Sequence, residues 1–193
     1  MSDSNITKNA LAASLRLLMK EKNFEKISVS DICDGCNMNR KSFYYHFRDK
    51  YDLLNWIFDI DFLENVKIFE LSDIDPHENG SEFLWEIIAR LADYFYKEKE
   101  FYRKALMIEG QNSFKDHFHD SLFPVIRYYF ADVVGGEEGD FFTSVMCDTS
   151  ISALVRWLME DKPMQPERFV QAFREYLVKL GRRLVNDIEG PTL

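Results

Sequence analysis

The sequence is poor in cysteine and histidine, and it lacks a long apolar run. Its 193 residues include 3 cysteines and 4 histidines. That is too few cysteines for a scaffold held together by disulfides. No apolar stretch approaches the roughly 20 residues that span a bilayer, and the N-terminus lacks the ordered segments of a secretory signal. We therefore expect a cytoplasmic protein without a membrane-spanning segment.

Catalytic and metal-binding patterns are missing as well. His117 and His119 are separated by one residue, which on one helix points their rings about 200° apart. The sequence contains neither a G-x-S-x-G nucleophile motif nor a glycine-rich phosphate loop. Cys33 and Cys36 form a C-x-x-C pair without a second pair, so a thiol or metal enzyme using both cysteines is a remote alternative. We expect no catalytic residues, no metal and no cofactor.

The chain is instead rich in apolar residues that recur with a helical period. Apolar residues make up 46% of the chain and aromatic residues 15%, and strand-like alternation is absent. Residues 72–81 (SDIDPHENGS) form the clearest break. We expect an all-α fold with an N-terminal domain of residues 1–50, a connecting helix of residues 50–71 and a C-terminal helical bundle of residues 80–193.

Residues 27–54 predict two short helices joined by a tight turn. Ser28, followed three residues later by Asp31, is the capping-box pattern that begins a helix. Asn37 tolerates the left-handed conformation of a sharp turn, and Asn39 can cap the next helix. The second helix would point Phe43 into the core and present polar and basic side chains outward.

Charge is distributed unevenly along the chain. The net charge is −9, but residues 1–50 hold nine Lys/Arg against six Asp/Glu, a net +3, and the remainder holds fifteen against twenty-seven, a net −12. Basic charge therefore accompanies the second helix, whose N-terminal residues would reach base edges in the major groove of double-stranded DNA. The alternative is a solvated basic surface. The predicted DNA contacts are Ser28, Ser30, Asn39, Arg40, Lys41, Ser42, Tyr44, Tyr45, His46 and Lys50.

The run from Ile32 to Leu54 resembles the DNA-binding domain of the tetracycline-repressor (TetR) family. The family pattern of small residue, turn, polar cap, Arg, Ser/Thr, aromatic, Tyr, His-Phe, Lys and Leu has these counterparts: Cys36, Asn37, Asn39, Arg40, Ser42, Phe43, Tyr44, His46, Phe47, Lys50 and Leu53. The chain departs from the family at two positions, because Asn37 stands where glycine is usual and Lys41 where a small residue is frequent.

A second resemblance covers Arg103 to Phe114 (RKALMIEGQNSF) and the last two predicted helices. This part is similar to a C-terminal domain common in TetR-type regulators of low-GC Gram-positive bacteria (Firmicutes). Together the resemblances imply a homodimeric transcriptional regulator on a palindromic operator, namely a repressor that an effector releases. The effector would be a small molecule or a protein partner. An activator or co-regulator whose C-terminal domain docks a protein partner is the alternative.

The last two predicted helices carry more apolar residues than one buried face needs. The first follows an acidic loop at residues 135–139 and is capped by Asp140, and the second begins near Pro166. Together with the same helices of a second copy, they can close a four-helix interface about a twofold axis. Alternatively, both faces are used within the monomer. The predicted dimer contacts are Phe142, Val145, Ile151, Leu154, Leu158, Phe173, Tyr176 and Leu177.

Overall fold

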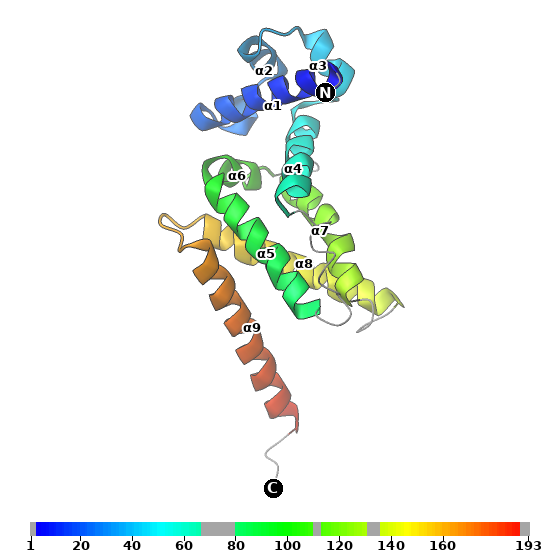
Figure 1. The fold of residues 1–193 in the computed structure, drawn as a ribbon, viewed down its shortest axis with the longest axis vertical. Helices are drawn as coiled ribbons and strands as arrows, with labels where there is room; N and C mark the ends of the chain where they lie inside the picture. The colour runs from blue at the N-terminus through cyan, green and yellow to red at the C-terminus, as the bar shows by residue number, and fades with distance from the viewer. Residues whose placement is uncertain (1–2, 67–79, 110–112, 131–135, 190–193) are drawn as a thin grey trace.

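The structure, a computed structural model, describes residues 3–66, 80–109, 113–130 and 136–189 (Figure 1). Within these ranges the chain is helical and contains no strand, which confirms the predicted fold class. The elements are α1 Asp3–Glu21, the 3-10 helix η1 Phe24–Lys26, α2 Val29–Gly35, α3 Arg40–His46, α4 Lys50–Val66, α5 Gly80–Lys97, α6 Lys99–Leu106, α7 Phe114–Phe130, α8 Gly136–Leu158 and α9 Pro166–Glu189.

The helices α1, α2 and α3 form a small unit at one end of an elongated molecule (Figure 1). Leu11, Leu15 and Met19 lie one turn apart on α1 and are fully buried, because residues four apart share one face of a helix. Ile32 of α2 and Phe43 of α3 are also fully buried. The predicted apolar stripes thus meet in one core beneath the exposed side of α3.

The helix α4 leaves this unit and enters the C-terminal bundle (Figure 1). It starts where the sequence predicts, since Asp49 Oδ1 accepts hydrogen bonds from the backbone N–H groups of Tyr51 (2.9 Å) and Asp52 (2.8 Å). The predicted end of this helix at Leu71 and residues 72–79 of the predicted break lie outside the described residues. Residues 80–81, predicted to belong to the break, form the start of α5.

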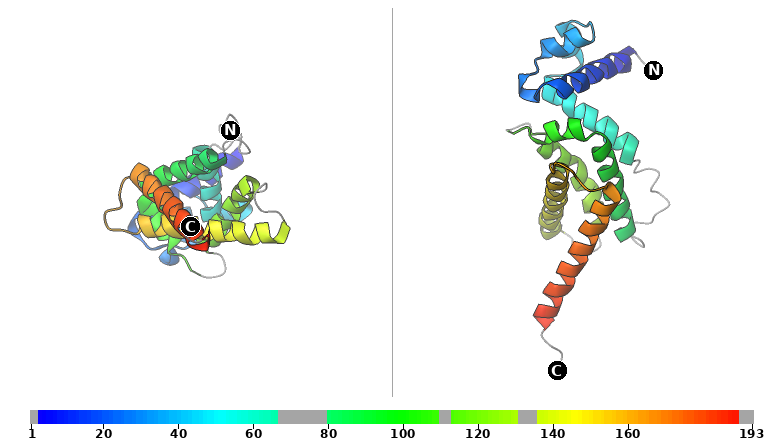
Figure 2. Two further views of the ribbon diagram at one scale, coloured as in Figure 1. Left: turned by 90° about the horizontal axis from the view of Figure 1, so that it is seen from below. Right: turned by 90° about the vertical axis from the view of Figure 1, so that its left-hand side faces the viewer.

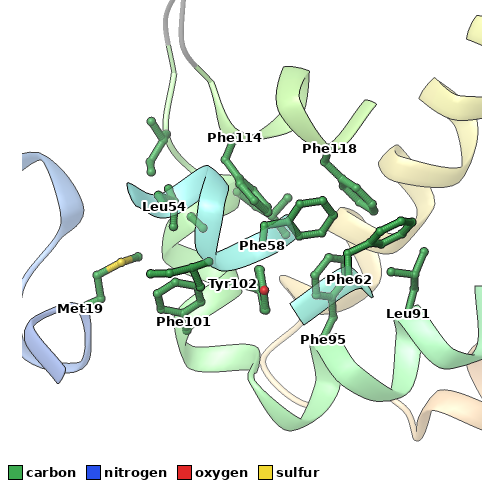
Figure 3. Close-up of a cluster of buried hydrophobic side chains, with 14 of the residues drawn as sticks. Met19, Leu54, Phe58, Phe62, Leu91, Phe95, Phe101, Tyr102, Phe114 and Phe118 are labelled. Atoms are coloured by element: carbon green, nitrogen blue, oxygen red, sulfur yellow. The ribbon is translucent and has the colours of Figure 1, made fainter. Parts of the chain in front are cut away.

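An aromatic cluster fixes α4 inside the C-terminal bundle. Figure 3 shows Phe58 of α4 among rings from α5, α6 and α7. The Phe58 ring centroid lies 5.2 Å from those of Phe114 and Phe118 and 6.3 Å from that of Phe95. Aromatic pairs at such separations add about 0.5–1.5 kcal/mol each beyond area burial. The packing therefore opposes any movement of α4 independent of these helices.

The helix α7 continues through Pro124 to Phe130 as one helix, and it packs along α8. Two predictions about α8 were wrong. The predicted acidic loop is in part the first turn of α8, which begins at Gly136. The carboxylate of Asp140 accepts a hydrogen bond from Arg127 of α7 at 2.5 Å rather than capping the helix. The exposed Glu137 in that first turn is favoured by the helix dipole.

The helix α9 packs against α5 along its first half and then projects from the body (Figures 1 and 2). Phe169 stacks on Trp157 of α8 at 4.3 Å between ring centroids, and Phe173 meets Trp85 of α5 edge-on at 5.9 Å. Beyond these anchors the projecting half leaves Tyr176 exposed. None of the described helices combines the length and apolar composition needed to cross a bilayer.

Candidate nucleic-acid interface

Local hydrogen bonds define the two short helices predicted within residues 27–54, α2 and α3, which with their turn form a helix-turn-helix. Ser28 Oγ accepts from the Asp31 N–H at 3.1 Å while Asp31 Oδ2 accepts from the Ser28 N–H at 2.8 Å, which confirms the capping box. Asn37 has a φ of 54° and forms the left-handed corner of the turn. Asn39 Oδ1 accepts from the Ser42 N–H at 2.8 Å and begins α3. The two helices and their turn are thus encoded within a few residues of each other.

A close approach of α1 to α2 holds this unit together. Ser14 Oγ of α1 donates to the carbonyl oxygen of Ile32 at 2.7 Å. A Cβ on Gly35 would lie only 2.3 Å from the same Ser14 oxygen, so a larger residue at position 35 would displace the Ser14 side chain and its hydrogen bond or push the helices apart. Sequence reasoning missed this contact. Its signals were a serine within the apolar stripe of α1 and a glycine in the last turn of α2.

The helix α3, which the sequence predicts to enter the major groove and which is called the recognition helix below, has one buried and one exposed face. Phe43 is fully buried, whereas Tyr45 is 83% exposed and Tyr44 51% exposed. Arg40 and Lys41 in the first turn are also exposed. The Arg40 guanidinium lies over the Tyr44 ring at 5.8 Å and donates to the Tyr44 hydroxyl at 3.4 Å. Two cations and two tyrosines therefore project from a short helix anchored by its own phenylalanine.

Several predicted DNA contacts also have roles within the fold. The Ser28 hydroxyl donates to Asp31 at 2.7 Å, and the Ser42 hydroxyl lies 3.2 Å from Asn39 Oδ1, so both hydroxyls belong to helix caps. Ser30 is exposed on α2, and His46 is half-buried in the last turn of α3. All four side chains lie on α2, α3 or their caps, and the structure gives a capping role to Ser28 and Ser42 but not to Ser30 or His46.

Lys50 has a partner set that the sequence did not reveal. Its ammonium donates to the carbonyl oxygens of Phe24 (2.7 Å), Ile27 (2.8 Å) and Glu25 (3.1 Å). The same ammonium lies 4.6 Å from the Phe24 ring centroid. Burial lowers the pKa of Lys50, while three carbonyl acceptors favour its charged form. Because an ammonium has three N–H donors, this geometry leaves none for the predicted phosphate contact.

Cys33, Cys36 and His117 have structural surroundings that bear on the enzyme alternative. Cys33 is buried, Cys36 is half-buried, and both are free thiols. Burial raises the pKa of both thiols, so little thiolate is present at neutral pH. His117 Nε2 lies 2.6 Å from Asp59 Oδ1, and the described ranges contain no His/Cys/Asp/Glu trio able to hold a metal. The geometry thus lends no support to a thiol or metal enzyme.

The predicted dimer contacts divide into an exposed and a buried group. Phe142, Val145 and Tyr176 are exposed, and Phe173 and Leu177 are half-buried. The buried group is Ile151, Leu154 and Leu158. These three residues pack within their own chain, on the face of α8 that closes the bundle. The exposed group is therefore the part of the predicted set that is available to a second copy, and the dimer interface itself stays a prediction.

An apolar crevice lies between α5, α7, α8 and α9. Its lining includes Leu91, Phe118, Leu154 and Phe173, and its cavity volume is about 20 Å³. This volume corresponds to about one water molecule. Ligand pockets for small molecules typically enclose roughly 300–1,000 Å³. Larger hollows lie at the surface. Those of about 420 and 460 Å³ adjoin each other and share Lys115, Ile151 and Ser152, and one of about 320 Å³ lies between α1 and α4.

Comparisons with known proteins cover both parts of the chain. Residues 10–57 match the family described as "Bacterial regulatory proteins, tetR family". Residues 84–179 match a family described as "Transcriptional regulator C-terminal region". The similar proteins named below are transcription regulators.

Three relatives show the range of the likeness. The chain is 30% identical over 110 residues to the dhaKLM operon transcriptional activator DhaS of Lactococcus lactis subsp. lactis (strain IL1403), a match spanning 56% of this chain and about half (54%) of DhaS. It is 23% identical to the HTH-type transcriptional regulator SAR2658 of Staphylococcus aureus (strain MRSA252) over 84% of this chain and 85% of that one. The crystal structure of NalD, the secondary repressor of the MexAB-OprM multidrug efflux pump in Pseudomonas aeruginosa, superimposes with a TM-score of 0.67 at 15% identity, covering 93% and 97% of the two chains. At that identity the structural likeness concerns the fold.

Proposed function

Since this chain belongs to the TetR family of DNA-binding transcriptional regulators, we propose that it binds a palindromic operator as a homodimer and releases it in response to an effector. One observation carries the proposal. The exposed face of α3 presents Arg40, Lys41 and Tyr44 from a helix that is capped by Asn39 and anchored by the buried Phe43. A rigid, capped helix with cations in its first turn suits insertion into the major groove.

Base reading falls to Arg40 and Lys41, because the first turn of a recognition helix lies closest to the base edges. The contacts to phosphates and sugars come from Ser30, Tyr44, Tyr45 and His46. Asn39, Ser28 and Ser42 act mainly by fixing the helix ends. For Lys50, which the sequence predicted as a DNA contact, we propose a structural role instead, because its ammonium already donates to three carbonyl oxygens.

The homodimer would form along the exposed sides of α8 and α9. Phe142 and Val145 on α8 and Tyr176 on α9 are large apolar residues left exposed by the chain. A helix that projects from the body while exposing such side chains leaves apolar surface that a second copy can bury. A twofold pair would hold the two α3 helices one DNA turn apart, roughly 34–36 Å. Residues 1–50 then act as the DNA-binding domain and residues 80–193 as the dimerisation domain, with α4 between them.

The effector has two candidate sources. A small molecule is the first. It would bind in the surface grooves beside Lys115 and Ser152, or in the crevice of about 20 Å³, which would have to open to accept it. The narrow crevice favours a second candidate, in which a protein partner docks on the C-terminal domain and the regulator acts as an activator. DhaS is an activator and NalD is a repressor, so transcription from a promoter carrying the selected operator, with and without the protein, distinguishes the two signs of regulation.

The test of DNA binding begins with selection of duplexes from a randomised DNA pool by the wild-type protein. We expect a palindromic consensus. Replacing Arg40 and Lys41 by alanine should then cost about 1–3 kcal/mol per residue on the selected operator and relax base preference at the contacted positions. Lys162→Ala, which changes an exposed lysine between α8 and α9, is the matched control. A double variant that kept the full operator preference would refute the assignment.

A further inference from the structure

Lys104 of the short helix α6 contacts the C-terminal end of α1. Lys104 Nζ donates to the carbonyl oxygens of Met19 at 2.5 Å and Lys20 at 3.1 Å, and it lies 3.4 Å from that of Lys22. Carbonyls in the last turn of a helix lack intrahelical donors and carry the negative end of the helix dipole. The Lys104 ammonium therefore caps a helix of the DNA-binding unit from the C-terminal domain.

The preceding residue of α6 makes the same kind of contact with a different helix. Arg103 Nε donates to the carbonyl oxygen of Leu158 at 2.7 Å, and its guanidinium also donates to the carbonyl oxygen of Glu160. These carbonyls lie at the C-terminal end of α8. Two adjacent cationic residues thus cap two helices that are far apart in the sequence. In Figure 1, α6 lies between α1 and the C-terminal end of α8.

A second contact prevents α1 from pivoting about Lys104. Arg16, one turn before Met19 on α1, forms an ion pair with Asp61 of α4 and donates to Glu98 at 3.4 Å. The Arg16 guanidinium lies 4.6 Å from the ring centroid of Phe101 on α6. Tyr102 is fully buried, and its hydroxyl donates to Asp61 at 2.8 Å. α1 is therefore attached to residues 98–104 at two points along its length.

We propose that Arg103 and Lys104 are positioning residues that set the angle of the DNA-binding unit on α8, and so the separation of the two recognition helices in the dimer. The inference rests on the proposed function, because separation has meaning only for a dimer on two half-sites. The helix α8 carries part of the proposed dimer surface. The helix α6 contacts the C-terminal end of α8 through Arg103 and the C-terminal end of α1 through Lys104. In this proposal, Arg103 and Lys104 pass a rotation of α8 to α1. The helix α4, which also joins the two parts of the molecule, is a second connection between them.

The experiment measures how strictly the protein selects half-site spacing. A palindromic duplex selected by the wild-type full-length chain is remade with one or two base pairs added to or removed from its centre, and affinities are measured for the whole series. We expect Lys104→Met and Arg103→Met each to reduce the preference for the best spacing by about fivefold or more, a coupling at the lower end of the usual range. Lys104→Arg, which retains a cation, should restore much of the preference.

Two features of this experiment distinguish residues that set the half-site spacing from residues that only stabilise the fold. Loss of folded protein lowers binding to every duplex equally, so the ratio between spacings within one preparation does not change. If the two residues act as one bridge, the double variant should show about the same loss as either single variant rather than their product. Lys99→Met is the control, since Lys99 is on the same helix but lies over the Tyr96 ring at 4.8 Å instead of capping α1 or α8.

The outcomes are distinguishable. A wild-type protein that selects no palindrome refutes the proposed function itself. A wild-type protein that selects a palindrome, with Lys104→Met and Arg103→Met variants that keep its spacing profile, overturns the positioning role and leaves DNA recognition in place. The positioning role is supported if the ratio of affinities for the best and the altered spacings falls in Lys104→Met and Arg103→Met and does not change in Lys99→Met.

Discussion

Replacing Lys50 by methionine separates a structural role from a DNA contact. The substitution keeps most of the aliphatic stem and removes the ammonium that donates to the carbonyls of Phe24, Glu25 and Ile27. These carbonyls belong to η1 and the residue after it, where backbone groups have few local donors. Lys50 therefore connects the start of α4 to the corner between α1 and α2.

The expected loss of stability follows from these contacts. A hydrogen bond to a charged group contributes about 1.5–3 kcal/mol, and a cation over an aromatic ring about 0.5–1 kcal/mol where solvent is near. The three bonds share one ammonium, and Glu25 is exposed, so water can replace part of the loss. We expect the free energy of unfolding to fall by about 2 kcal/mol. For a chain of this size, that lowers the melting temperature by about 4–8 °C.

The assay combines thermal unfolding with salt-dependent operator binding, and Lys26→Met is the control because Lys26 is an exposed lysine of η1. At a temperature where all variants are folded, Lys50→Met should keep the wild-type slope of log K against log[salt]. A phosphate contact would instead lower that slope by about 0.9. A variant with unchanged melting temperature and a reduced slope would refute the structural role and restore the DNA contact.

Two further predictions concern packing and assembly. Gly35→Ala should lower the free energy of unfolding by about 1–3 kcal/mol, as overpacking does, because the added Cβ would lie 2.3 Å from Ser14 Oγ. In a Ser14→Ala background the same substitution should cost less. Urea denaturation of the single and double variants measures both costs, and equal costs in the two backgrounds would contradict the prediction. Phe142→Asp combined with Tyr176→Asp should give monomers in analytical ultracentrifugation with unchanged helix content by circular dichroism, whereas Leu154→Asp should unfold the C-terminal core. A wild-type protein that is already monomeric at micromolar concentration would contradict the proposed dimer interface.

Sequence by itself determined the features that depend on near neighbours. The Ser28–Asp31 capping box, the left-handed Asn37 and the Asn39 and Asp49 caps all involve atoms within three residues of each other. Such contacts form whenever the local backbone folds, so residue type and spacing suffice to predict them. The apolar period likewise predicted that Phe43 would be buried, and this burial gives α3 its exposed face.

Only the tertiary structure decided which partner each long side chain would meet. The sequence predicted Lys50 as a DNA contact and gave no role to Lys104, yet each lysine binds carbonyls more than twenty residues away. Leu154 and Tyr176 both lie on apolar helical stripes, but one is buried and the other exposed. A helical period shows that a face is apolar and leaves open which surface covers it, because that depends on how α5, α7, α8 and α9 cross. The same packing, which no local pattern encodes, brought Arg103 and Lys104 to the ends of two different helices.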